Sequence, residues 1–121
     1  MSSDKKQIFI VDDDESVGRA LKLLMMTYGF AVEIFSSAEK FFSAVSNSVP
    51  GCLILDIHLP GMNGWEAKRK LTESGCDRRV IMITADKEEG LKEHALKAGA
   101  LGYLQKPFTD QELIDLSNLA F

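Results

Sequence analysis

The chain has 121 residues, of which 45% are hydrophobic and 26% charged, and its formal net charge is −4. This length allows one domain with a real hydrophobic core, and the composition is ordinary for a soluble globular protein. The negative charge argues against a direct nucleic-acid interface, because such interfaces need a broad basic surface.

Apolar segments typical of strands alternate along the chain with segments of helical periodicity. We expect strands at 8–11, 31–35, 52–56, 80–84 and 101–105, and helices at about 17–28, 38–45, 65–74, 88–99 and from 109 onward. The capping-box pairs Ser36 with Glu39 and Thr109 with Glu112 predict where the second and last helices begin. Five successive strand–helix units indicate an α/β protein whose parallel sheet is covered by helices on both faces.

The strands differ in how apolar they are, and this difference predicts their order in the sheet. The segments 8–11, 52–56 and 80–84 are apolar throughout and are therefore central, whereas 31–35 carries Glu33 in its middle and fits an edge. The order 2-1-3-4-5 follows, which is the flavodoxin-like, doubly wound (βα)5 arrangement, with residues 1–121 in one domain. Ligands of such sheets bind at the carboxyl ends of the strands, beside the switch point between the first and third strands.

Charged and hydroxyl side chains follow four of the predicted strands. They are Asp12 and Asp13 after the first strand, Asp56 at the end of the third, Thr84 at the end of the fourth and Lys106 after the fifth. Carboxylate ligands suit a hard cation such as Mg²⁺ or Mn²⁺, and a carboxylate can attack phosphorus to form an aspartyl phosphate. A cation would also offset the repulsion within the stretch VDDDES, roughly 4 kcal/mol for two charges about 4 Å apart at an effective dielectric near 20.

Most of these residues also have a purely structural interpretation. Asp12 and Asp13, taken alone, fit helix capping better than metal binding, and only their combination with Asp56 and Lys106 reverses that preference. Asp14 and the following Glu15 fit the first turn of a helix, where the helix dipole stabilises negative charge.

Several further residues also have a structural interpretation. Thr84 could simply end a strand, and Tyr103 could be a half-buried strand residue. Trp65 is expected to pack locally at the start of a helix, and His94 to lie on a solvated helical face. The short basic run 68–70 fits a solvated face better than a nucleic-acid contact.

The motifs FIVDDDE, LILDIHLPGMNGWE, IMITA and YLQKPF occur in this order, and together they make nearly the whole chain similar to the receiver domain of bacterial two-component response regulators. The resemblance implies that Asp56 accepts a phosphoryl group from the phosphohistidine of a sensor histidine kinase or a histidine phosphotransfer protein. It also implies that Asp12, Asp13, Asp56 and the backbone carbonyl of His58 hold Mg²⁺ or Mn²⁺.

The same resemblance assigns a switching role to residues after the fourth and fifth strands. Thr84 and Lys106 would sense the phosphoryl group, and Tyr103 would turn inward when Thr84 moves. The Lys106–Pro107 peptide bond would be cis, a form that about 5–6% of X–Pro bonds adopt.

The resemblance also implies which surface of the domain acts on its partners. The face made by the fourth helix, fifth strand and fifth helix would change on phosphorylation and control a partner or an output domain, with homodimerisation through this face as one outcome. His58 and Asp86 stand two residues after Asp56 and Thr84, at positions that vary in the family and tune the lifetime of the phosphoryl group. We expect no output domain within residues 1–121, and no enzyme activity beyond the domain's own phosphotransfer and autodephosphorylation.

Two other functions compete with this interpretation. A phosphatase of the haloacid-dehalogenase type would use Asp12 as its nucleophile, but the residue at position 16 is Ser, where that motif has Thr or Val, and the chain lacks room for the usual cap domain. A flavodoxin-like electron carrier would need a phosphate-binding loop rich in Ser, Thr and Gly after the first strand, where this chain has an acidic run.

Cysteine content and the N-terminus predict the compartment. Cys52 and Cys76 are too few and too far apart for a disulfide scaffold or a zinc site. The N-terminal stretch MSSDKKQ lacks the apolar region of a signal peptide, and no apolar stretch approaches the length of a membrane span. We therefore expect a cytoplasmic protein without membrane contact.

Overall fold

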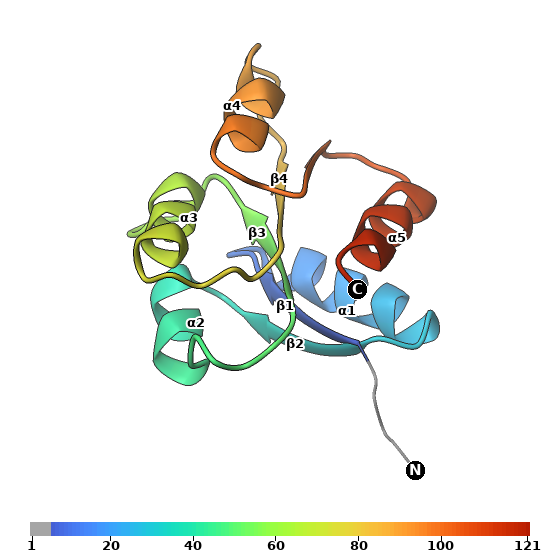
Figure 1. Ribbon diagram of the computed structural model, residues 1–121. Coiled ribbons are helices and arrows are strands. Elements are labelled where there is room, and N and C mark those ends of the chain that lie inside the picture. Colours follow the sequence, from blue (N-terminus) through green and yellow to red (C-terminus); the bar gives the residue numbers. More distant parts are fainter. Residues whose placement is uncertain (1–5) are drawn as a thin grey trace.

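The computed structural model describes residues 6–121, whose strands form one parallel sheet in the order β2-β1-β3-β4-β5 (Figure 1). This order confirms the predicted doubly wound arrangement, with β2 at an edge. Residues 1–5, on which the expectation of no signal peptide partly rests, lie outside the described residues. Among the residues that are described, no helix has both the length and the apolar character needed to cross a membrane.

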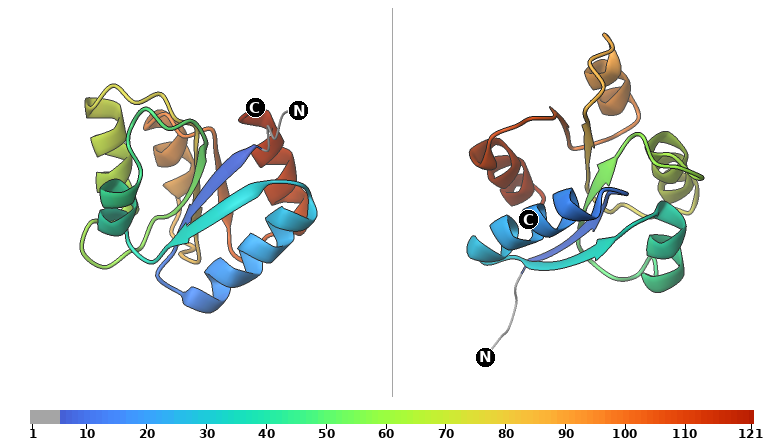
Figure 2. Two further views of the ribbon diagram at one scale, coloured as in Figure 1. Left: turned by 90° about the horizontal axis from the view of Figure 1, so that it is seen from below. Right: turned by 180° about the vertical axis from the view of Figure 1, so that it is seen from behind.

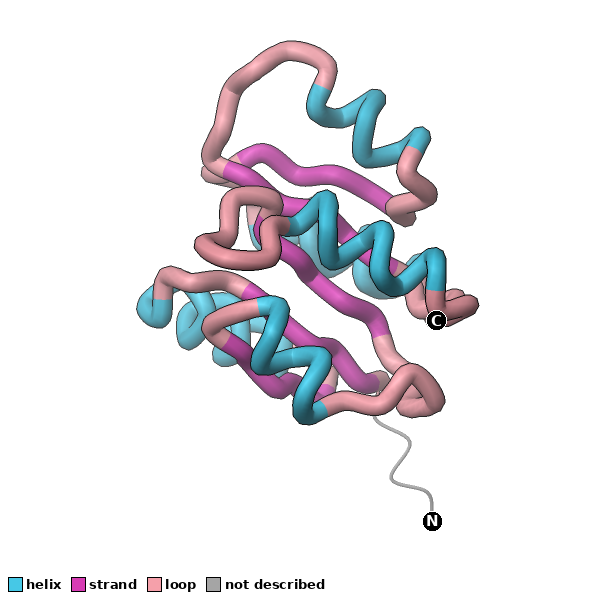
Figure 3. Tube along the Cα trace, turned by 90° about the vertical axis from the view of Figure 1, so that its left-hand side faces the viewer, coloured by secondary structure: helices cyan, strands magenta, loops and turns pink. Residues whose placement is uncertain are grey.

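Strands and helices alternate without exception from residue 7 to residue 119. The strands are β1 Gln7–Val11, β2 Ala31–Phe35, β3 Cys52–Asp56, β4 Val80–Thr84 and β5 Gly102–Gln105. The helices are α1 Glu15–Thr27, α2 Ala38–Ala44, α3 Gly64–Glu73, α4 Leu91–Lys97 and α5 Asp110–Leu119. Figure 3 shows the strands side by side in the middle of the molecule, with helices in front and behind.

The sheet separates two hydrophobic cores, because successive side chains of a strand point to opposite faces. The left view of Figure 2 shows α2, α3 and α4 on one side of the sheet and α1 and α5 on the other. Phe9, Leu53 and Met82 pack toward the first group of helices, whereas Ile10 and Ile54 pack toward the second. The three central strands are thus buried on both faces, which explains why their sequences show no polar alternation.

Helix α4 is shorter than the sequence predicted. It spans Leu91–Lys97 rather than 88–99, because its N-cap residue Gly90 has φ of +85°, a left-handed conformation that interrupts the helical backbone. The backbone N–H of Glu88 donates instead to the side chain of Asp86, at 2.8 Å, within the loop that joins β4 to α4. The predicted helix start was therefore three residues too early.

The capping box predicted for α2 was also wrong. The N-cap is Ser37, whose hydroxyl accepts a hydrogen bond from the backbone N–H of Lys40 at 3.1 Å, not Ser36. The Glu39 carboxylate accepts from the backbone N–H of Met62 at 2.9 Å and so ties α2 to the loop between β3 and α3. The Glu39 carboxylate, which the local pattern assigned to the helix start, thus accepts a hydrogen bond from a distant part of the chain instead. The box at Thr109 and Glu112 is present as predicted.

Candidate functional site

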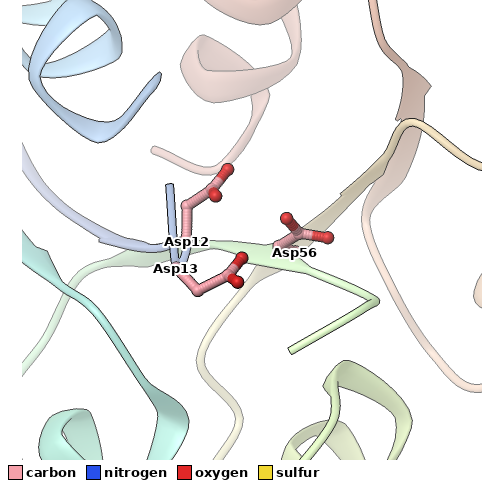
Figure 4. A group of neighbouring side chains, drawn as sticks. All are labelled: Asp12, Asp13 and Asp56. Atoms are coloured by element: carbon pink, nitrogen blue, oxygen red, sulfur yellow. The ribbon is translucent and has the colours of Figure 1, made fainter. Parts of the chain in front are cut away.

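Three carboxylates meet at the carboxyl ends of β1 and β3. One carboxylate oxygen from each of Asp12, Asp13 and Asp56 lies within 4.8 Å of the other two, and Figure 4 shows the three side chains around one space. Asp12 and Asp56 are only 4% and 6% exposed, whereas Asp13 is exposed. Water therefore reaches the group from the Asp13 side, and the two buried charges need compensation from within the protein.

Of the three aspartates between β1 and α1, one caps the helix and two belong to the carboxylate cluster. The backbone N–H of Asp12 donates to the Phe35 carbonyl at 3.1 Å, so the residue continues the contact between β1 and β2. Asp14 is the N-cap of α1, because its side chain accepts hydrogen bonds from the backbone N–H groups of Ser16 and Val17. The structural interpretation thus holds for Asp14, while Asp12 and Asp13 are left to face Asp56.

Lys106 supplies the positive charge that faces this cluster. Its Nζ donates to Asp12 Oδ2 at 2.9 Å and to Asp56 Oδ2 at 3.3 Å, and its side chain is 21% exposed. The backbone N–H of Lys106 donates to the Thr84 carbonyl at 2.7 Å, and the Lys106–Pro107 peptide bond is cis. The ends of four strands, β1, β3, β4 and β5, are thereby connected through one side chain and its backbone.

Burial and neighbouring charges change the acidity of the central groups. Burial raises the pKa of Asp56, and the charge of Asp12 raises it further, whereas Lys106 and the backbone N–H of His58 oppose the change. Burial alone would lower the pKa of Lys106, but its bonds to the two aspartates outweigh this and raise it. Asp56 is therefore under electrostatic stress that a second cation would relieve.

A second group of polar contacts borders the cluster on the β4 side. Thr84 is fully buried, and its hydroxyl oxygen accepts a hydrogen bond from the backbone N–H of Asp86 at 3.0 Å. His58 Nε2 bonds to Asp86 Oδ2 at 2.8 Å, which joins the residue two positions after Asp56 to the one two positions after Thr84. The Asp86 pKa is lowered, first by the backbone N–H of Glu88 and then by His58. Tyr103 is half-buried nearby, and burial together with the Asp86 charge raises the pKa of its phenol.

Gly64 is a close neighbour of Asp56 that sequence reasoning missed. A Cβ atom at this residue would lie 2.6 Å from the Asp56 carbonyl oxygen and 2.6 Å from the Ile57 Cα. The backbone N–H of Gly64 donates to the Ile57 carbonyl at 2.8 Å, and a capping box between Asn63 and Glu66 fixes the same end of α3. The sequence did contain a signal, since Gly64 directly follows Asn63, and Glu66 stands three residues after that asparagine, a pattern typical of a helix start. At this helix start, only glycine allows the backbone to approach the Asp56 carbonyl so closely.

The donor set fits a divalent cation. Three carboxylates and one ammonium leave a formal charge of −2 when all are ionised, and oxygen ligands on a partly exposed site suit Mg²⁺, which retains several of its waters. The backbone N–H of His58 donates to Asp56 Oδ1 at 3.0 Å, which brings the His58 peptide next to the same carboxylate. The arrangement can therefore hold a cation and a phosphoryl group against one buried nucleophilic oxygen.

Comparison with known proteins gives a consistent result. A family model described as the response regulator receiver domain matches residues 8–118. The response regulator protein TodT of Pseudomonas putida is 40% identical over 114 residues, which are 94% of this chain and 50% of TodT. The chain thus spans about half the length of the curated relatives it matches.

Solved structures are similar over nearly the whole chain. The crystal structure of FixJ-N has a TM-score of 0.88 and 32% identity, and the match covers 99% of this chain and 94% of that one. A response regulator receiver protein from Burkholderia phymatum has a TM-score of 0.79 and 43% identity, with 92% and 90% of the two chains covered.

Proposed function

This chain belongs to the response regulator receiver family, whose members are phosphoacceptor signalling switches, and from that premise we propose that Asp56 is its phosphoacceptor. The observation that carries the proposal is the position of the buried Asp56 carboxylate, which lies beside Asp12 and Asp13 and accepts a hydrogen bond from Lys106 Nζ, the same atom that bonds Asp12. A carboxylate so placed is held in one orientation, with a cation-binding cluster and a fixed ammonium beside it.

The proposed reaction transfers a phosphoryl group from a phosphohistidine. A carboxylate oxygen of Asp56 attacks the phosphorus, the P–N bond breaks, and its electron pair stays on the imidazole, which takes a proton from water. Asp12, Asp13 and Asp56, with the backbone carbonyl of His58, would hold Mg²⁺ or Mn²⁺, which when bound supplies charge neutralisation for the phosphoryl oxygens. Lys106 Nζ exchanges its contact with Asp56 for one with a phosphoryl oxygen.

The switch proposed for the β4 side follows from the same contacts. The Thr84 hydroxyl now accepts from the backbone N–H of Asp86, and a phosphoryl oxygen on Asp56 offers this hydroxyl a strong acceptor for its own proton. Movement of Thr84 toward Asp56 would release the loop after β4 and let Tyr103 turn inward. The face formed by α4, β5 and α5 then favours a second arrangement, which is a shift between two populations.

The proposed partners follow from the family. A sensor histidine kinase or a histidine phosphotransfer protein supplies the phosphoryl group in the cytoplasm, and the α4-β5-α5 face controls an output domain or pairs with a second copy. FixJ of Bradyrhizobium diazoefficiens, 30% identical over 109 residues, is named a transcriptional regulatory protein, and 53% of its length is covered by the match. DNA binding, where the full protein performs it, belongs in this proposal to a segment other than the receiver domain.

A phosphatase with Asp12 as nucleophile is not supported. The family match is to receiver domains. The hydrogen bonds do not separate the two carboxylates, since the oxygens of Asp12 accept from the backbone N–H of Asp14 and from Lys106, and those of Asp56 accept from the backbone N–H of His58 and from Lys106. The family match therefore decides against this alternative.

The test uses a small phosphodonor in place of the kinase. Incubation with acetyl phosphate and Mg²⁺, followed by intact-protein mass spectrometry, is expected to add one phosphoryl group to the wild type and none to Asp56→Asn. Asp77→Asn, an exposed acid away from the site, serves as the matched control and should be labelled like the wild type. Equal labelling of Asp56→Asn and the wild type would refute the assignment, and label retained by Asp56→Asn but lost by Asp12→Asn would instead favour the phosphatase.

A further inference from the structure

The rings of Trp65 and His94 stack between the neighbouring helices α3 and α4, with centroids 4.0 Å apart and planes inclined by 13°. Trp65 lies at the start of α3 and His94 is exposed, as predicted, but the stacking of the two rings was not predicted from the sequence. We propose that this stack is a positioning pair that couples the Asp56 end of β3 to the orientation of α4. The inference rests on the proposed function, because it concerns the helix that the phosphoryl group is proposed to move.

The Trp65 end of the stack is tightly bound to the phosphoacceptor strand. Trp65 directly follows Gly64, whose Cα approaches the Asp56 carbonyl so closely that a Cβ would lie 2.6 Å from its oxygen. The hydrogen bond from Gly64 N–H to the Ile57 carbonyl, at 2.8 Å, fixes the same junction. Trp65 is itself half-buried against the hydrophobic core on this face of the sheet. A shift of the Asp56 backbone is therefore transmitted to the Trp65 ring through rigid contacts.

The His94 end of the stack belongs to a short helix that packs on β5 and enters the core through Ala95. Helix α4 has 7 residues, Ala95 is its only buried residue, and its N-cap Gly90 makes no side-chain capping bond. Helices of this length owe their stability to tertiary contacts rather than to their own hydrogen bonds. The stack on Trp65 of α3 therefore adds a contact between helices to the packing of α4 against β5.

The surroundings of the stack leave α4 room to move. A hollow of about 230 Å³ lies beside the two rings and is lined by Lys68, Arg69, Thr72 and Ala98. The α3–α4 boundary is therefore open around the stack rather than filled by interlocking side chains, and separation of the rings does not require repacking of a core. The stack provides a second connection from Asp56 to α4, separate from the loop that carries Thr84 and Asp86.

The experiment compares three single variants of α4. His94→Ala removes the stacked ring, His94→Phe keeps an aromatic ring there, and Lys97→Ala is the matched control, because Lys97 is an exposed residue of the same helix. Amide hydrogen exchange is measured over 91–97 and over α5 in the unphosphorylated proteins. Since Trp65 is the only tryptophan of the chain, its fluorescence is measured before and after addition of acetyl phosphate and Mg²⁺.

Loss of one aromatic stack is expected to speed exchange in 91–97 roughly two- to tenfold in His94→Ala and to leave α5 unchanged. His94→Phe and Lys97→Ala should exchange like the wild type. Phosphorylation should change Trp65 emission in the wild type and in Lys97→Ala, and much less in His94→Ala. Exchange in His94→Ala that matches the wild type, or an equal emission change, would overturn the coupling role.

The two proposals fail in different ways. Absence of label on Asp56 in the wild type would remove the proposed phosphoacceptor, and the exchange measurement on unphosphorylated protein would still decide whether the stack positions α4. Normal labelling of Asp56 together with unchanged α4 exchange in His94→Ala would remove the coupling and leave the phosphoacceptor intact.

Discussion

Replacement of Asp56 by Asn removes one charge from the three carboxylates that share the ends of β1 and β3, and we expect the metal-free protein to become more stable as a result. Asn keeps an oxygen that can accept the hydrogen bond now donated by the backbone N–H of His58. Lys106 keeps its shorter contact with Asp12. The substitution therefore changes the charge of the site more than its packing.

The magnitude follows from the distances in the cluster. Oxygens of Asp12 and Asp13 lie within 4.8 Å of an Asp56 oxygen, so each pair repels by about 3.5 kcal/mol at an effective dielectric of about 20. Lys106, at 3.3 Å, attracts Asp56 by about 5 kcal/mol on the same scale. Water weakens the repulsion between Asp13 and Asp56, because Asp13 is exposed. Burial of the Asp56 charge destabilises the folded protein further, as the repulsion does. We expect Asp56→Asn to raise the free energy of unfolding by about 1–2 kcal/mol without metal.

The pH dependence has a definite sign. Burial raises the pKa of Asp56 above its ordinary value of 3.8, so the folded protein binds this proton more tightly than the unfolded chain does. Ionisation of Asp56 therefore lowers the free energy of unfolding of the wild type. Relative to Asp56→Asn, the wild type becomes less stable as the pH rises from 3.8 through the raised pKa. Below the ordinary pKa of 3.8, Asp56 is protonated in both the folded and the unfolded wild type. The difference in the free energy of unfolding between the wild type and Asp56→Asn should then vanish.

Urea denaturation in EDTA at pH 7, and again at pH 3, measures this difference directly. Asp77→Asn is the control and should stay within about 0.5 kcal/mol of the wild type. A cation at 100 times its Kd stabilises the protein that binds it by about 2.7 kcal/mol, so Mg²⁺ should narrow or reverse the gap by favouring the wild type. An Asp56→Asn variant less stable than the wild type in EDTA at pH 7 would contradict the electrostatic reasoning.

Three further substitutions test neighbouring parts of the site. Lys106→Ala leaves the two buried aspartates without their ammonium and should lower the free energy of unfolding in EDTA by about 2–3 kcal/mol; Mg²⁺ should recover more stability in this variant than in the wild type, and an equal gain would argue against charge compensation. Gly64→Ala forces α3 away from the Asp56 strand and should cost about 1–3 kcal/mol in urea denaturation, whereas Gly18→Ala, whose Cβ would meet its nearest atom at 3.8 Å, should be neutral or stabilising. Thr84→Val removes the acceptor of the Asp86 N–H and should cost about 1–3 kcal/mol and speed exchange of that amide, and unchanged exchange would refute this role of the hydroxyl.

The fold could be predicted from the sequence because the residue types of each strand indicate how deeply that strand is buried. The buried strands β3 and β4 are apolar except at their last residues, Asp56 and Thr84, and the strand with a charge in its middle, at Glu33, lies at the edge. Helix boundaries were less predictable. The conformation of Gly90 shortened α4, and the contact of Glu39 with Met62 removed a capping box, and both depend on tertiary surroundings that periodicity does not contain.

The main residues of the site were predictable for a topological reason. Once the strands are parallel, their carboxyl ends lie at the same edge of the sheet, so Asp12, Asp56 and Lys106, which end or follow β1, β3 and β5, were expected to lie near one another. The pairing of His58 with Asp86 and of Trp65 with His94 follows no such rule. Each pair joins residues nearly thirty positions apart on neighbouring loops or helices, and only the packing of those elements brings the side chains together.

The same edge of the sheet that collects the charged groups is also where α3 and the β4–α4 loop begin. A change at Asp56 therefore meets two structural elements at once: the Gly64 junction, which leads through Trp65 to α4, and the Thr84 hydroxyl, which leads through Asp86 to the same helix. Because Ala95 is the one buried side chain of α4, these two attachments add to its packing on β5 in setting its orientation. A helix held in this way can respond to a small local change with a shift in population, which a deeply packed helix resists.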